Sequence, residues 1–128
     1  MEDWKNKKIL VVEDDTFLSD LLAKHFTQEG IQFDFAVDGE SALIKAKEMK
    51  PGLVLLDLFL PGIDGYEVLK QLKADPALAS VPVIILSNLG QKEEIEKGMA
   101  LGATDFLVKA KFDLSDIVSK VKNALSKD

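Results

Sequence analysis

The sequence contains no cysteine, a single histidine and no long hydrophobic run. Without cysteine the chain can form no disulfide, no thiol nucleophile and no thiolate metal site. No apolar run approaches the roughly 18 residues that a membrane-spanning helix needs. The acidic start at residues 1–8 is not that of a signal peptide, so we expect a cytoplasmic location and no association with a membrane.

Positive charge is also in short supply, with 16 Lys and Arg against 22 Asp and Glu and a formal net charge of -6. This balance argues against broad binding of nucleic acid or of an anionic membrane. The chain is 47% hydrophobic and 30% charged, which is typical of a globular protein rather than a disordered one. Its 128 residues predict one domain over 1–128, with a core over 8–125.

Short apolar runs alternate with stretches of helical periodicity along the whole chain. The strands are predicted at residues 8–12, 31–37, 53–57, 83–86 and 104–108. Helices are predicted from a cap at 15 or 16 to Gly30, from the turn at 38–41 to 49, from 64–67 to before 75, and over 93–100 and 113–125. The run at 31–37 alternates apolar and polar residues, which favours an edge strand. Right-handed crossovers then give an α/β fold with a parallel sheet covered by helices.

Charged and hydroxyl side chains stand where four of these strands end: Glu13 and Asp14, Asp57, Ser87, and Lys109. The carboxyl ends of parallel strands share one edge of the sheet, where open α/β sheets bind ligands. Three carboxylates about 4–6 Å apart repel by about 3–4 kcal/mol per pair at an effective dielectric near 20. One lysine offsets part of this, so the cluster is expected to hold a proton or a hard divalent cation such as Mg²⁺.

Each of these residues also has an ordinary structural interpretation when it is taken alone. The acidic run at 13–15 is typical of a helix cap or a solvated loop, and Asp57 is equally typical of a turn. A lysine at the end of a strand is more often a surface charge. Their co-occurrence at the ends of strands that independently predict one sheet favours a functional site.

Four segments resemble the CheY-like receiver domain of two-component response regulators: ILVVEDD at 9–15, LLDLFLPGIDG at 55–65, IILS at 84–87 and ATDFLVK at 103–109. The resemblance extends from residue 8 to residue 125. It implies a flavodoxin-like, three-layer sandwich whose doubly wound, five-stranded parallel sheet has the strand order 2-1-3-4-5.

The resemblance implies a function in phosphorelay signal transduction. Asp57 would accept a phosphoryl group, as an acyl phosphate, from a sensor histidine kinase or a histidine phosphotransferase. The domain would catalyse its own phosphorylation and dephosphorylation and would otherwise be no enzyme. Asp14, Asp57 and the backbone carbonyl of Phe59 would bind Mg²⁺, with Mn²⁺ as a substitute, and Glu13 would act through a metal-bound water.

The resemblance also implies how the phosphorylated state is sensed. Lys109 and the Ser87 hydroxyl would contact phosphoryl oxygens, and Phe106 would act as an aromatic switch that turns toward the core. The surface of the fourth helix, fifth strand and fifth helix would then change for a downstream target protein or an output domain outside this sequence. We expect no direct binding of nucleic acid by this domain, and a monomer or a weak dimer that forms on phosphorylation.

The sequence departs from the family pattern at several positions. Glu13 stands where Asp is commoner, which predicts a changed metal affinity. Ala110 replaces the usual proline after Lys109, and because a non-proline cis peptide bond costs about 3–4 kcal/mol, we expect this bond to be trans. Phe59 and Leu89 flank the site and cannot orient a water, which predicts slow loss of the phosphoryl group.

Other functions are compatible with parts of this pattern. A Mg²⁺-dependent phosphatase of the dehalogenase type also forms an aspartyl phosphate, but its nucleophile would follow the first strand in an Asp-x-Asp arrangement, where this chain has Glu13-Asp14-Asp15. A flavodoxin would need a phosphate-binding loop after the first strand, which is absent. A scaffold receiver that is not phosphorylated is disfavoured because all the required groups are present. His25 is expected at the surface, and without a nucleotide-binding loop the chain is not itself a kinase.

Overall fold

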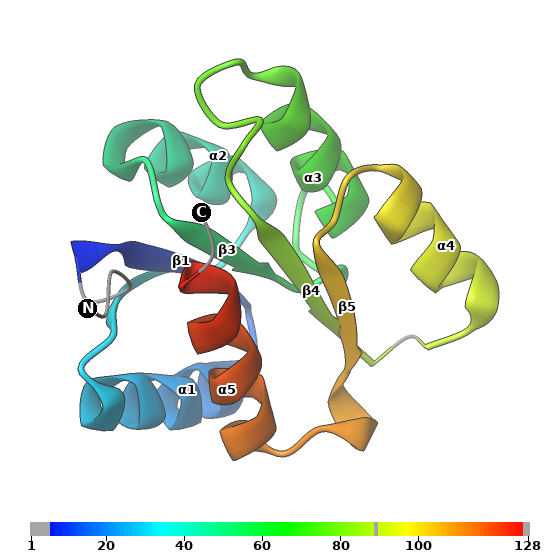
Figure 1. The fold of residues 1–128 in the computed structure, drawn as a ribbon. Coiled ribbons are helices and arrows are strands. Elements are labelled where there is room, and N and C mark those ends of the chain that lie inside the picture. Colours follow the sequence, from blue (N-terminus) through cyan, green and yellow to red (C-terminus); the bar gives the residue numbers. More distant parts are fainter. Residues whose placement is uncertain (1–5, 89, 127–128) are drawn as a thin grey trace.

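The computed structural model describes residues 6–88 and 90–126, over which five β-strands alternate with five α-helices (Figure 1). The strands are β1 (Lys8–Val12), β2 (Gln32–Ala36), β3 (Leu53–Leu56), β4 (Val83–Ser87) and β5 (Asp105–Val108). The helices are α1 (Thr16–Glu29), α2 (Gly39–Met49), α3 (Gly65–Ala74), α4 (Lys92–Ala100) and α5 (Leu114–Leu125). The predicted alternation is confirmed.

The five strands form one parallel sheet in the order β2-β1-β3-β4-β5. The last residue of β1, Val12, lies opposite Ala36 of β2 and Leu56 of β3. At the other side of the sheet, Ser87 lies opposite Val108. This register brings the residues that follow β1, β3, β4 and β5 together at the end of the sheet where the strands have their carboxyl ends. The predicted order is confirmed, and β2 lies at the edge of the sheet, as its alternating pattern predicted.

Successive side chains of the central strands point to opposite faces of the sheet and build two cores. Leu10 and Val12 pack in the core that α2 and α3 cover, and Ile9 and Val11 pack in the core that α1 and α5 cover. Figure 1 shows these two helix pairs on opposite sides of the sheet. Strands that are buried on both faces are expected to be apolar throughout, as β3 is over its whole length and β1 is from Ile9 to Val12.

Aspartates begin four of the helices. Asp15, Asp38, Asp64 and Asp113 each accept a hydrogen bond from backbone N–H groups in the first turn of the helix that follows. Part of the acidity of this chain is therefore structural, including the third residue of the acidic run at 13–15. Among the described residues, no helix combines the length and the apolar character needed to cross a bilayer.

Between β5 and α5, the structure contains an element that the sequence did not predict. A single turn of 3₁₀ helix, Lys109–Lys111, follows β5 directly. A turn of three residues is too short to show a hydrophobic period, so the sequence pattern did not predict it. The peptide bond between Lys109 and Ala110 is trans, as the absence of proline predicted.

Candidate functional site

Three carboxylates meet at the edge of the sheet where the strands end. Glu13 and Asp14 follow β1, and Asp57 follows the neighbouring strand β3. One carboxylate oxygen from each lies within 4.8 Å of the other two. Glu13 and Asp57 are only 3% and 5% exposed, whereas Asp14 is exposed. The structure therefore brings together the three acids that the sequence placed at one edge.

Lys109 joins this cluster from the end of β5. Its Nζ lies 2.9 Å from Glu13 Oε1 and 3.1 Å from Asp57 Oδ2, and its side chain is only 16% exposed. The 3₁₀ turn that begins at Lys109 fixes the backbone from which the side chain reaches inward. One ammonium thus bridges two buried carboxylates, and the cluster keeps an excess of negative charge.

Backbone N–H groups hold the two buried carboxylates in place. Phe59 N donates to Asp57 Oδ1 at 3.2 Å, and Asp15 N donates to Glu13 Oε2 at 3.1 Å. Asp57 is therefore held from both sides, by Phe59 N at Oδ1 and by Lys109 at Oδ2. The orientation of the carboxylate is set before any ligand arrives, which reduces the reorganisation that a reaction there needs.

The pKa of Glu13 reflects its burial beside Asp57. Burial, together with the neighbouring Asp57, raises the pKa of Glu13 from 4.5 to about 7, although Lys109 acts in the opposite direction. Burial lowers the pKa of Lys109, but Glu13 and Asp57 outweigh it and the pKa of Lys109 lies above its ordinary value. The lysine therefore stays charged, while Glu13 gains or loses its proton near neutral pH.

The donor set fits a hard divalent cation. Three carboxylates offer oxygen atoms close enough to share one ion, and oxygen ligands are those that Mg²⁺ and Mn²⁺ prefer. Burial and the neighbouring Asp57 raise the pKa of Glu13, and a bound cation would favour the ionised form of this carboxyl. The acidic cluster of Glu13, Asp14 and Asp57 could therefore bind a metal ion.

Metal binding by this cluster is expected to depend on pH. Because a bound cation favours the ionised form of Glu13, whose pKa is about 7 without it, the affinity for Mg²⁺ should rise about tenfold from about pH 6 to about pH 8. Titrations of the backbone amide signals with Mg²⁺ at several pH values measure this slope. Glu13→Gln, which has no proton to lose, should show a flat profile, and a flat profile in the unmodified chain would contradict the prediction.

The raised pKa also has a consequence for stability. The folded state holds a proton on Glu13 that the unfolded chain releases above its ordinary pKa of 4.5. The stabilisation from this group is therefore complete below about pH 4.5 and is lost as the pH rises through about 7. Mg²⁺ should offset that loss most at the alkaline end of this range.

The remaining predicted site residues, Ser87 and Phe106, lie on β4 and β5. Ser87 ends β4, is fully buried and lies opposite Val108, the residue before Lys109. Phe106 lies within β5 and faces the core beneath α4, with 8% of its surface exposed. Its ring is already inward in this structure, in the orientation that the resemblance implied for the phosphorylated state.

Leu89, which was expected to flank Asp57, lies outside the described residues. Glu40 was missed: its Oε1 accepts a hydrogen bond from Ile63 N, 3.1 Å away, in the loop that follows Asp57. The two residues are 23 positions apart in the sequence, so no local pattern signalled the contact.

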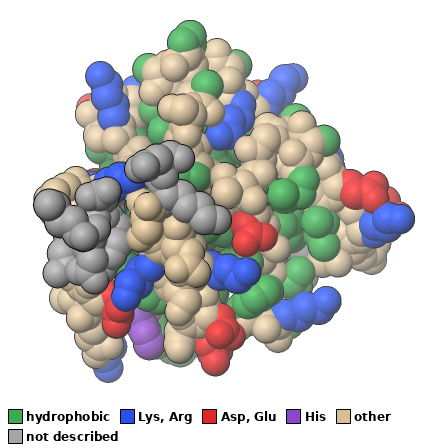
Figure 2. Space-filling view, viewed as in Figure 1, with side chains coloured by type: hydrophobic (Ala, Val, Ile, Leu, Met, Phe, Trp, Pro, Cys, Tyr) green, Lys and Arg blue, Asp and Glu red, His purple; other side chains and the backbone are tan. Residues whose placement is uncertain are grey.

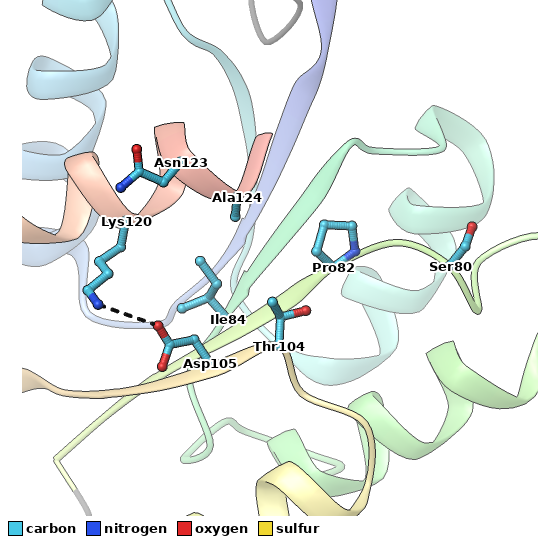
Figure 3. Close-up of a pocket in the computed structure, with 8 residues that line it drawn as sticks. All are labelled: Ser80, Pro82, Ile84, Thr104, Asp105, Lys120, Asn123 and Ala124. Carbon is cyan, nitrogen blue, oxygen red and sulfur yellow. Dashed lines mark ion pairs between the residues drawn. The ribbon is translucent and has the colours of Figure 1, made fainter. Parts of the chain in front are cut away.

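A surface cavity of about 410 Å³ lies at the opposite edge of the sheet (Figure 3). It is lined where β4 and β5 begin, by Pro82, Thr104 and Asp105, and by the side of α5 that carries Lys120. Lys120 Nζ and Asp105 Oδ2 form an ion pair there at 3.8 Å. None of the predicted site residues lines this cavity. The cavity is therefore not part of the candidate site formed by Glu13, Asp57 and Lys109.

Comparison with known proteins gives a consistent result. The family model described as the response regulator receiver domain matches residues 9–122. The DNA-binding dual master transcriptional regulator RpaA of Synechocystis sp. is 36% identical over 118 residues, which are 92% of this chain and 48% of RpaA. The chain spans about half the length of the curated relatives that it matches first.

Solved structures give the same result for the fold. The receiver domain of the Francisella response regulator 1452 has a TM-score of 0.86 at 30% identity, with 94% of this chain and 97% of that chain covered. The Mn²⁺-bound form of response regulator Rcp1 has a TM-score of 0.78 at 30% identity, with 91% and 90% covered. Each fold extends over nearly the whole of both chains.

Proposed function

The chain belongs to the response regulator receiver domain family, and on that premise we propose that Asp57 accepts a phosphoryl group from a phosphohistidine of a partner protein. The observation that carries the proposal is the setting of Asp57. It is a nearly buried carboxylate at the end of a central strand, in contact with Lys109 and within 4.8 Å of two further acids. A carboxylate so placed is suited to form an acyl phosphate.

The transfer we propose is a displacement at phosphorus. An oxygen of Asp57 forms a bond to phosphorus while the bond from phosphorus to the histidine nitrogen breaks, and negative charge spreads over the three phosphoryl oxygens. Lys109 Nζ, already 3.1 Å from Asp57 Oδ2, would contact one of these oxygens. Ser87, buried at the end of β4, would donate its hydroxyl to another. Preorganised donors of this kind lower the barrier because they need no rearrangement during the reaction.

We propose that the acidic cluster holds Mg²⁺, with Mn²⁺ as a substitute. Asp14, Asp57 and the backbone carbonyl of Phe59 would be the ligands, and Glu13 would act through a bound water. When bound, the ion neutralises charge on the transferring phosphoryl group and helps to align it. The chain's own contribution is to orient Asp57, through the Phe59 N–H and Lys109.

An exposed aromatic side chain beside the site suggests where the phosphate donor docks. Phe17, in the first turn of α1, is 73% exposed and follows Asp15 by two residues. Leu18 and Leu21, on the same helix, are partly buried. Aromatic side chains are enriched in protein–protein interfaces relative to the rest of the surface. We propose this start of α1 as part of the surface that meets a histidine kinase or histidine phosphotransferase.

We propose that the signal leaves through the surface formed by α4, β5 and α5, toward a downstream protein or an output domain. Figure 2 shows hydrophobic side chains gathered where α4 meets β5, with charged side chains at the outer end of the helix. Gly98 is the only residue of α4 that is buried, so few side chains anchor this helix. An element with so little buried surface is readily displaced by a local change at Ser87.

The second candidate function is an aspartyl-phosphate phosphatase whose nucleophile follows β1. Asp14 occupies that position, but it is exposed, and among residues 6–88 and 90–126 it has no lysine contact like that of Asp57. The family match over residues 9–122 also favours the receiver function.

Incubation with acetyl phosphate tests the proposed function. The chain should gain one phosphoryl group per molecule when Mg²⁺ is present and none when the metal is chelated, as measured by intact-mass spectrometry. Continuous release of phosphate without a stable labelled protein would support the phosphatase instead.

Phe59→Asn is expected to speed the loss of the phosphoryl group. Phe59 follows Asp57 by two residues and is 57% exposed, and its ring can neither donate to nor accept from a water. An amide there would orient a water toward phosphorus, with an expected effect on the order of tenfold, below the roughly 10²-fold of a general base. The decay of labelled protein after removal of acetyl phosphate measures this rate. Phe59→Leu, which stays apolar, should decay like the parent, and an unchanged rate in Phe59→Asn would exclude this role for the ring.

A further inference from the structure

Phe59 lies in the loop between β3 and α3, two residues after Asp57. A hydrogen bond holds the two ends of this loop together. Gly65 N donates to the carbonyl oxygen of Leu58 at 2.9 Å. A Cβ at residue 65 would lie 2.4 Å from the carbonyl oxygen of Asp57, so only glycine permits this closure. The base of the loop is therefore fixed, and the intervening residues need another support.

Glu40 supplies a support from a different helix. Its Oε1 accepts the hydrogen bond from Ile63 N at 3.1 Å, although the Glu40 side chain is exposed to solvent. The carboxylate also lies directly over Gly62, whose φ of 78° is in the left-handed region. A Cβ at residue 62 would lie 2.3 Å from Glu40 Oε1. The turn and the carboxylate thus fit together only because residue 62 is glycine.

The start of α2 holds Glu40 in position. Asp38 caps the helix by accepting from Ser41 N at 2.7 Å. Gly39 packs so closely on the loop that a Cβ there would lie 2.3 Å from Ile63 Cγ1 and 2.7 Å from the Ile63 carbonyl oxygen. The first turn of α2 and residue 63 of the loop therefore meet at two independent points.

This geometry points to Glu40 as a positioning residue for the cation site. By holding the β3–α3 loop at Ile63, it keeps the backbone carbonyl of Phe59 where a divalent cation can use it. Glu40 itself lies outside the cluster of Glu13, Asp14 and Asp57 and would touch neither the ion nor the phosphoryl group. The inference rests on the proposed function, because it takes the Phe59 carbonyl to be a metal ligand.

Glu40 also has a purely structural interpretation that the experiment must separate. A carboxylate in the first turn of a helix interacts favourably with the helix dipole, and α2 has Glu40 there. Glutamine at this position keeps the oxygen that accepts from Ile63 N but loses the charge. Alanine loses both, so the two variants distinguish the hydrogen bond from the charge.

The test compares Glu40→Ala, Glu40→Gln and Glu48→Ala. Glu48 is exposed near the other end of α2, so its replacement removes the same charge away from the loop. Titration with Mg²⁺, followed through the backbone amide signals of Phe59 and Ile63, should show about fivefold weaker binding for Glu40→Ala. Glu40→Gln and Glu48→Ala should stay within about twofold of the parent chain. Should Glu40→Ala not fold, Glu40→Asp, whose shorter side chain does not reach Ile63 N, takes its place.

A second readout separates positioning from general damage. Labelling by acetyl phosphate should be slower in Glu40→Ala at limiting Mg²⁺ and equal to that of the parent chain at saturating Mg²⁺. Equal Mg²⁺ affinity in Glu40→Ala, equally weak binding in Glu40→Gln, or slow labelling that persists at saturating Mg²⁺ would each overturn the role of Glu40. Absence of Mg²⁺ binding and labelling in the parent chain would instead overturn the proposed function, and this inference with it.

Discussion

Asp57→Asn is expected to take up no phosphoryl group from acetyl phosphate at any Mg²⁺ concentration. Asparagine keeps the shape of Asp57 and an oxygen that can accept from Phe59 N, but its amide is not a nucleophile for phosphorus. Labelling should fall at least about 10³-fold, as when a nucleophile is removed from other sites. Intact-mass spectrometry at several incubation times measures the loss, and circular dichroism checks that the fold is kept.

Asp15→Asn is the matched control for this variant. Asp15 lies in the same acidic run as Glu13 and Asp14, but its side chain caps α1 by accepting from Phe17 N and Leu18 N. Asparagine caps a helix as well as aspartate does. The same loss of charge should therefore leave labelling within about twofold of the parent chain. Full labelling of Asp57→Asn would contradict the assignment of Asp57 as the nucleophile, whatever labelling Asp15→Asn shows.

Lys109→Ala is expected to slow labelling by about 10²- to 10³-fold at saturating Mg²⁺, the range found when one donor to a developing oxyanion is removed. Lys109 is the cation that contacts both buried carboxylates, Glu13 and Asp57. Because Lys109 lowers the pKa of Glu13, its removal should move that pKa above about 7. Initial labelling rates, and the pH titration of the Glu13 carboxyl carbon by NMR, measure the two effects.

Lys111→Ala provides the comparison for Lys109→Ala. Lys111 belongs to the same 3₁₀ turn, and its replacement by alanine removes the same charge, but its side chain is exposed. Its labelling rate and the pKa of Glu13 should match those of the parent chain. A labelling rate in Lys109→Ala within about twofold of the parent would show that the lysine does not act on the transferred group.

The sequence predicted the layout of the sheet because its strands are buried on both faces. Runs such as 9–12 and 53–56 are apolar throughout, which only a strand covered on both sides requires. Once the strands were parallel, Glu13, Asp14, Asp57 and Lys109 had to end at one edge. No further information was needed to bring these side chains together, and the structure places them there.

Features that depend on packing between distant segments could not be predicted. The packing of Phe106 against α4 depends on the close approach of that helix, where a Cβ on Gly98 would lie 3.2 Å from Phe106 Cδ2. The direct contact of Glu13 with Lys109 depends on the longer side chain of Glu13 and on a 3₁₀ turn of three residues. The hydrogen bond between Glu40 and Ile63 N joins a helix to a loop. None of these contacts produces a period or a motif in the sequence.

The measurement that tests the central claim most directly is the position of the phosphoryl group. The chain is incubated with acetyl phosphate and Mg²⁺, the acyl phosphate is reduced with hydride to homoserine, and the peptides are mapped by mass spectrometry. We predict homoserine at residue 57 alone, and only when Mg²⁺ is present. Homoserine at residue 14 or 15 with continuing release of phosphate, or no modified residue at all, would contradict the assignment of Asp57 as the phosphoryl acceptor.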